Sequence, residues 1–137
     1  MNTTTLNTLQ ADASLVRLTH ITYGLHAIGL ALGVFGSSTV VGAFLGLPSV
    51  IALIINYVKR SDVRGTWLES HFNWQIRTFW WVLIWAVLIF LVSAPLVLLL
   101  GLGFVTGFTG IMILGIWAIY RIARGWLRLG SREVMPA

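Results

Sequence analysis

The chain has 137 residues, of which 58% are apolar and only 9% are charged, and its net charge is +5. A soluble domain of this size cannot bury so much apolar surface. The apolar residues form long runs rather than the in-out alternation of an outer-membrane strand. The composition therefore predicts an all-α integral membrane protein, and the lack of cysteine excludes disulfides, thiolate metal sites and cysteine nucleophiles.

Residues 1–16 are polar and threonine-rich. They lack the cationic start and short apolar core of a cleaved secretory signal. We therefore expect a polar cytoplasmic segment, followed by a first membrane span that is retained and serves as the targeting signal.

The first two spans are predicted from the 41 uncharged residues between Arg17 and Lys59. One crossing needs about 20 apolar residues, so this stretch fits two spans. We place them at 17–35 and 39–58, joined by small residues. Pro48 lies inside the second span, and the sequence leaves open whether it kinks or ends the helix.

The last two spans are predicted from the 43 uncharged residues between Arg77 and Arg121, with a glycine-rich turn near the middle of the stretch. We place them at 77–100 and 104–120, and Pro95 again leaves a kink or an early end open. Residues 17–121 then form a transmembrane four-helix bundle, and residues 122–137 form a basic cytoplasmic tail.

All Lys and Arg residues lie before the first span, between the second and third spans, or after the fourth. They are Arg17, Lys59, Arg60, Arg64, Arg77, Arg121, Arg124, Arg128 and Arg132. Cationic loops are retained on the cytoplasmic side. The pattern predicts a multi-pass protein of the bacterial inner membrane with both termini cytoplasmic, and it argues against nucleic-acid binding because the charge accompanies the membrane boundaries.

The segment before the third span is predicted to be amphipathic and cytoplasmic. Gly65 and the spacing of Thr66 and Glu69 fit a capping box at a helix start. Tryptophan is typical of the membrane interface and arginine of contact with anionic headgroups. The predicted headgroup contacts are Trp67, Trp74, Trp126, Arg121, Arg124 and Arg128.

One face of the first span is small and polar, with Thr19, Thr22 and Tyr23, and the opposite face is bulky and apolar, with Ile21 and Ile28. The small face is expected to contact protein and the bulky face to contact lipid. Glycines four residues apart allow close helix crossings. The predicted helix-packing glycines are Gly29, Gly33, Gly42, Gly46, Gly103, Gly107 and Gly110.

Polar residues of the first three spans are expected to meet near the cytoplasmic side. The candidate cluster is His20, Tyr23, His26, Asn56, His71 and Gln75. A histidine inside a span is costly without a partner, so a binding role and a structural hydrogen-bond network both stay open. No carboxylate falls inside the spans, which argues against a proton relay. No catalytic set, metal site or cofactor is predicted.

Three segments resemble small bacterial membrane proteins of the DUF4870 type, grouped with the chloroplast import component Tic20. They are residues 55–60 (INYVKR), 69–75 (ESHFNWQ) and 120–126 (YRIARGW). The resemblance implies four helices and no enzyme activity, and for Tic20 it implies membership in a protein-translocating assembly.

The expected function is that of a non-enzymatic accessory, assembly or stabilising subunit of a larger membrane complex. Its partners would be a protein within the membrane or further copies of the chain, together with anionic lipid. The alternatives are an oligomeric channel, carrier or protein-translocation component, and a haem- or quinone-binding module using His20 or His26.

Overall fold

The structure is a computed structural model that describes residues 11–36, 46–99 and 101–136. Within these residues the chain forms four helices and no strand, so the predicted all-α class is confirmed there. The helices are α2 (Ala13–Gly36), α4 (Leu47–Val58), α5 (Leu68–Leu98) and α6 (Leu102–Gly130). Gly42 and the beginning of the predicted second span lie outside the described residues.

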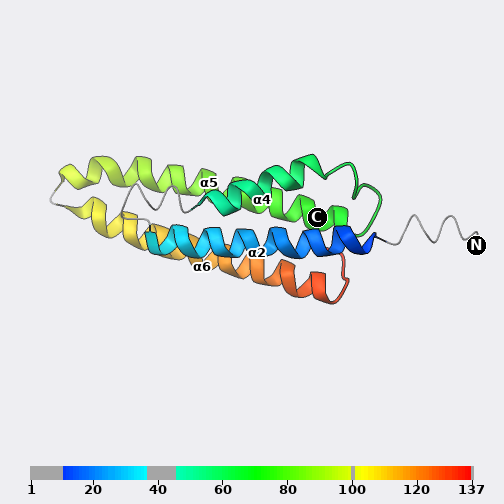
Figure 1. The fold of residues 1–137 in the computed structure, drawn as a ribbon. Helices are drawn as coiled ribbons and strands as arrows, with labels where there is room; N and C mark the ends of the chain where they lie inside the picture. The colour runs from blue at the N-terminus through cyan, green and yellow to red at the C-terminus, as the bar shows by residue number, and fades with distance from the viewer. Residues whose placement is uncertain (1–10, 37–45, 100, 137) are drawn as a thin grey trace, which may run out of the picture.

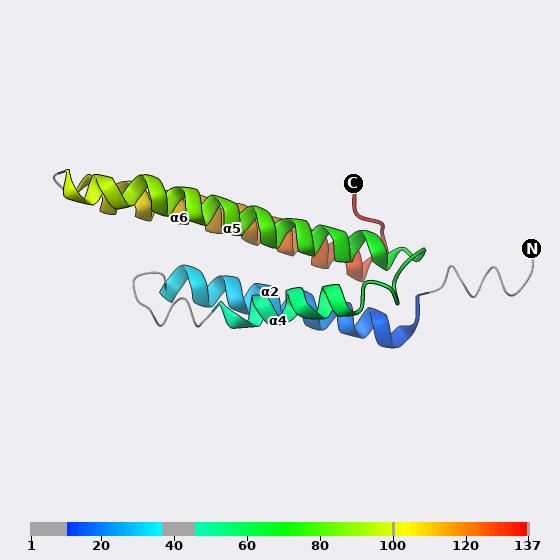
Figure 2. The same cartoon turned by 90° about the horizontal axis from the view of Figure 1, so that it is seen from above.

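The helices are arranged in two layers (Figures 1 and 2). One layer is a long hairpin of α5 and α6, and the other contains α2 and α4. The hairpin turn is short, and Gly101 within it has a φ of 74°, a conformation that favours glycine. The hairpin projects well beyond the end of α2 in both views, so its outer part has no other described helix beside it.

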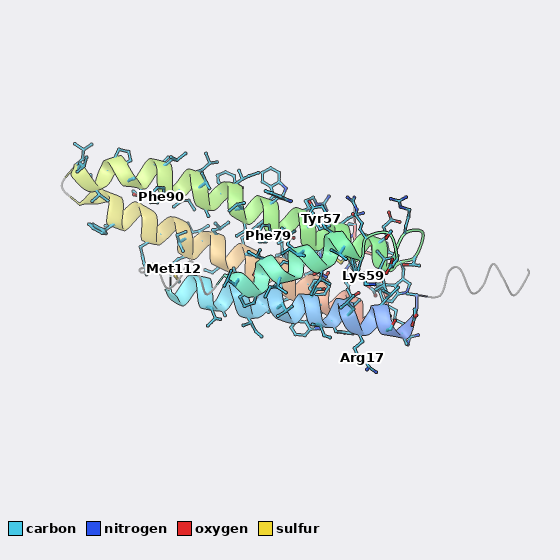
Figure 3. All side chains as sticks on the ribbon, turned by 45° about the horizontal axis from the view of Figure 1, so that its top comes forward. Arg17, Tyr57, Lys59, Phe79, Phe90 and Met112 are labelled. Carbon is cyan, nitrogen blue, oxygen red and sulfur yellow. The ribbon has the colours of Figure 1, made fainter. Side chains whose placement is uncertain are left out.

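The cationic residues gather at one end of the bundle, as the topology requires. The beginning of α2, the end of α4, the beginning of α5 and the end of α6 lie together there (Figure 1). Figure 3 shows Arg17 and Lys59 towards this end, whereas Phe90 and Met112 lie farther along the hairpin. We call it the cationic end.

Neither proline interrupts a helix. Pro48 occupies the first turn of α4, where its missing N–H is not needed. Pro95 lies inside α5, and the helix continues past it to Leu98. The sequence had left a kink or an early end open at each position.

Two of the described helices, α5 and α6, are long and apolar enough to cross a membrane by length and composition. Only 6% of the most apolar 18-residue window of α5 is buried, and 17% of that of α6. The core helix of a soluble protein would bury most of such a window.

α4 has 12 residues and is therefore about 18 Å long, which is shorter than the roughly 30 Å hydrocarbon core of a bilayer.

The two faces of α2 are divided as the sequence predicts. Thr19, Thr22 and Tyr23 are fully buried against the other helices, whereas Ile21 and Ile28 are half exposed. The small, polar face therefore lies against the other helices, and contact of the bulky face with lipid stays a prediction.

The apolar core lies at the cationic end. It is formed by Tyr23, Val63, Leu68, Phe72 and Leu129. The residues come from α2, the α4–α5 connection, the beginning of α5 and the end of α6. The first turns of α5 therefore bury Leu68 and Phe72 against the other helices, whereas the sequence predicted an amphipathic segment at the membrane surface.

The beginning of α5 differs in detail from the predicted capping box. The helix begins at Leu68. The Glu69 carboxylate accepts a hydrogen bond from the backbone N–H of Gly65 (2.8 Å). The Thr66 hydroxyl donates to the carbonyl of Val63 (2.7 Å) instead of accepting from the helix. The acidic residue thus caps the preceding turn, and the threonine does not cap the helix.

Candidate functional site

The first part of the polar site is a buried pair between the two layers. Tyr23 and His71 are both fully buried. The Tyr23 hydroxyl lies 3.1 Å from Nδ1 of His71. Nε2 of His71 lies 2.8 Å from the backbone carbonyl of Glu133, which can only accept, so Nε2 carries the proton. In the neutral imidazole, Nδ1 then accepts from the Tyr23 hydroxyl.

His71 precedes the predicted third span and is held neutral by its surroundings. Burial lowers the pKa of its imidazole, and the nearby Arg128 and His20 lower it further, while the hydrogen bond to the Glu133 carbonyl acts in the opposite direction. A neutral ring can satisfy both of its partners. This arrangement is more typical of a structural hydrogen bond than of a side chain that transfers protons.

The C-terminal residues complete this end of the bundle. After α6 the chain turns back, and the backbone N–H of Met135 donates to the Ser70 hydroxyl (3.0 Å). The Met135 side chain is buried. The predicted basic tail is therefore helical up to Gly130 and then folds onto the beginning of α5.

The second part of the site is an amide pair. Nδ2 of Asn56 donates to Oε1 of Gln75 over 3.1 Å, which joins α4 to α5. Both side chains are buried. Oδ1 of Asn56 and Nε2 of Gln75 have no partner among the described residues. The pair therefore holds the layers together but leaves one acceptor and one donor unused.

The remaining two histidines occupy different environments. Nδ1 of His20 accepts a hydrogen bond from the indole N–H of Trp126 (2.9 Å) at an exposed position. His26 is 96% buried, and its Nε2 has no partner in the part of the chain that the structure describes. The candidate cluster is thus divided into two hydrogen-bonded pairs, Tyr23 with His71 and Asn56 with Gln75. His20 bonds Trp126 instead, and Nε2 of His26 has no partner among the described residues.

His26 faces a cavity of about 320 Å³, which we call the interlayer cavity. It lies between the two layers, and its lining comes from all four helices, including Tyr23, His26 and Gly33 of α2 and Gln75 and Thr78 of α5. The other lining residues are predominantly apolar.

Arg121 of α6 contacts Trp74 and Thr78 of α5. The Arg121 guanidinium lies 3.7 Å from the ring centroid of Trp74, and its Nε donates to the Thr78 hydroxyl (3.0 Å). The indole N–H of Trp74 donates to the backbone carbonyl of Arg121 (3.1 Å). Trp74 is buried, so its predicted role as a headgroup contact is wrong. The ring and the indole N–H of Trp74 instead contact Arg121 of the same chain.

The other predicted headgroup residues are more accessible. Trp126 is partly exposed beside His20. Arg124 donates to the Tyr120 hydroxyl (3.1 Å), and Arg128 lies 3.8 Å from the Glu133 carboxylate. Trp67 is half-buried and packs edge-on against His71. Their contact with lipid stays a prediction.

Part of the predicted glycine set lies close to a neighbouring helix. A Cβ at Gly29 would clash with Ser49 of α4, and one at Gly103 would clash with the α5 backbone at Val97. Gly107 and Gly110 also lie against α5. Gly46 forms the N-cap of α4.

Gly33 differs from the prediction, because a Cβ there would meet no atom of the described residues within 4 Å. The spacing to Gly29 identifies a helix face but does not show which glycine reaches the neighbour. Gly125 was not among the predicted packing glycines, yet a Cβ there would lie 2.7 Å from Cε1 of Tyr23. Its position between Arg124 and Trp126 gave no packing signal.

No group of three or more metal-binding side chains occurs in residues 11–36, 46–99 and 101–136. The comparisons with known proteins add no relative: no family model, no curated protein and no solved structure matches the chain. Among the described residues, the site consists of two hydrogen-bonded pairs, His26 with an unpartnered Nε2, and a mostly apolar cavity.

Proposed function

We propose that the chain is a non-enzymatic, multi-pass protein of the bacterial inner membrane that acts as an accessory subunit of a larger membrane complex. Both termini would be cytoplasmic, in keeping with the cationic end. The observation that carries the proposal is the exposed apolar surface of α5 and α6, whose most apolar windows are almost unburied. Such a surface requires lipid or a protein partner around it.

A groove on the hairpin supports association with another protein. It has a volume of about 730 Å³, and we call it the α5–α6 groove. Its lining is Trp81, Trp85, Ile89, Gly110, Ile113, Leu114, Trp117 and Arg121. It shares only Leu114 with the interlayer cavity. Tryptophan and arginine are enriched among the residues that dominate binding energy in protein interfaces, so the proposed occupant is an apolar helix of a membrane partner.

The unpartnered part of Arg121 favours a polar contact within this interface. Its Nη2 atom is buried and has no hydrogen-bond partner among the described residues. A carbonyl or hydroxyl of the partner helix would satisfy it. The resemblance to the DUF4870 and Tic20 group agrees with a role in an assembly, and membership in that group stays part of the proposal.

The test is co-purification from native membranes in a mild detergent. Trp81→Ala with Trp85→Ala should remove the partner while leaving the amount of folded chain unchanged. Trp80→Ala is the matched control, because Trp80 has the same 45% exposure as Trp81 but lies outside the groove. Partner retention by the double variant, or the lack of any stoichiometric partner of the wild type, would contradict the proposal.

A further inference from the structure

We propose that the interlayer cavity binds an uncharged, single-chain lipid whose carbonyl head accepts hydrogen bonds from His26 and Gln75. The inference rests on the membrane location but not on a protein partner. It concerns a surface separate from the α5–α6 groove.

The size of the cavity calls for an occupant larger than water. A site of about 10–15 Å³ is enough for one water molecule, and an engineered apolar cavity of about 150 Å³ binds benzene. The interlayer cavity has about 320 Å³. Its lining is mostly apolar, so a filling of ordered water would have few hydrogen-bond partners.

Two buried side chains of the cavity lining carry unpartnered polar atoms. His26 is 4% exposed and Gln75 is 2% exposed. Nε2 of each has no partner in the described part of the chain. Leaving a buried donor unpaired is unfavourable. With the His26 proton on Nε2, both atoms are donors, and the proposed ligand carbonyl would lie between α2 and α5 within hydrogen-bond distance of both.

The polar neighbours of these groups are already satisfied by the protein. The Thr78 hydroxyl donates to the carbonyl of Trp74 (2.7 Å) and accepts from Arg121. The Tyr23 hydroxyl lies against His71. The two unpartnered nitrogens therefore define where a ligand head would lie.

The cavity becomes apolar with distance from the cationic end. On α5 its lining begins at Trp74 and ends at Ala86, and the rise along the helix from Gln75 to Ala86 is about 16 Å. Gly33 is the last described lining residue on α2, and a Cβ there would meet no described atom within 4 Å. A head at Gln75 with one hydrocarbon chain directed towards Ala86 matches this gradient.

The lining also determines the charge of the head. No Asp, Glu, Lys or Arg is among the described residues that line the cavity. A charged head buried there would lack a counter-ion and would be strongly disfavoured. The required chemistry has two sources, the ring carbonyl of an isoprenoid quinone and the ester carbonyl of a monoacylglycerol.

The experiment measures binding of decylubiquinone and of monolaurin to the purified full chain by calorimetry in detergent micelles. Binding of either probe at a 1:1 ratio supports the proposal and identifies the source of the carbonyl. His26→Leu should weaken binding at least tenfold, which corresponds to about 1.4 kcal/mol. His20→Leu is the matched control and should bind as the wild type does, because His20 does not line the cavity.

A second variant tests the apolar end independently of the histidine. Ala86→Phe would fill the space for the chain and should abolish binding, while far-ultraviolet circular dichroism shows that the helices remain. Binding of neither probe to the wild type would overturn the proposal. The proposal would also be overturned if His26→Leu and Ala86→Phe both bound the probe with wild-type affinity. Because no partner protein is present, this outcome is independent of the co-purification result.

Discussion

The hydrogen bond between Tyr23 and His71 joins the two layers and lends itself to a double-mutant cycle. Tyr23→Phe removes only the hydroxyl and leaves Nδ1 of His71 unpaired. Since both side chains are fully buried, the free energy of unfolding should fall by about 1–3 kcal/mol. His71→Phe should cost more, because it leaves the Tyr23 hydroxyl and the Glu133 carbonyl both unpaired.

The coupling energy of the pair should be about 0.5–1.5 kcal/mol, the usual net value of one hydrogen bond. Unfolding by denaturant in mixed micelles, followed by tryptophan fluorescence, measures it. Tyr57→Phe is the control: among the described residues the Tyr57 hydroxyl accepts a hydrogen bond only from the exposed Trp80, so this substitution should change stability by less than about 0.5 kcal/mol. A coupling energy indistinguishable from zero would refute the role of this pair in holding α2 against α5.

Three further predictions concern packing and pH, all measured as unfolding free energies in the same micelles. Gly29→Leu should destabilise the fold by about 1–3 kcal/mol by overpacking, whereas Gly33→Leu should have little effect because a Cβ there contacts nothing. Gly125→Ala should destabilise the fold by displacing the buried ring of Tyr23, and wild-type stability would contradict that contact. Because the folded pKa of His71 lies below its unfolded value, stability should be complete above about pH 6.5 and decrease as the pH falls below it, with a smaller decrease in His71→Phe.

The features that could be predicted from the sequence are those determined by one helix at a time. The periodicity of α2 predicts that Thr19, Thr22 and Tyr23 face protein, because one face of a helix is defined by spacing alone. The distribution of Lys and Arg predicts that four helix ends gather at one end of the bundle, since alternate helices run in opposite directions.

The features that could not be predicted depend on which helices meet and at what height. Tryptophan is a typical residue of the membrane interface, but Trp74 is buried, with the Arg121 guanidinium of α6 over its ring. Gly125 matters because Tyr23 of α2 lies against it, a pairing that no local pattern contains. The same holds for the carbonyl of Glu133, which reaches His71 only because the chain turns back after α6.

The most direct test of the account is the accessibility of single cysteines in intact bacteria, since the chain has no cysteine of its own. Leu102 lies at the tip of the α5–α6 hairpin and Ser61 lies in the α4–α5 connection, and both are exposed. A membrane-impermeant thiol reagent should label Leu102→Cys in intact cells and should label Ser61→Cys only after the membrane is opened. Labelling of Ser61→Cys in intact cells without labelling of Leu102→Cys would contradict the proposed topology.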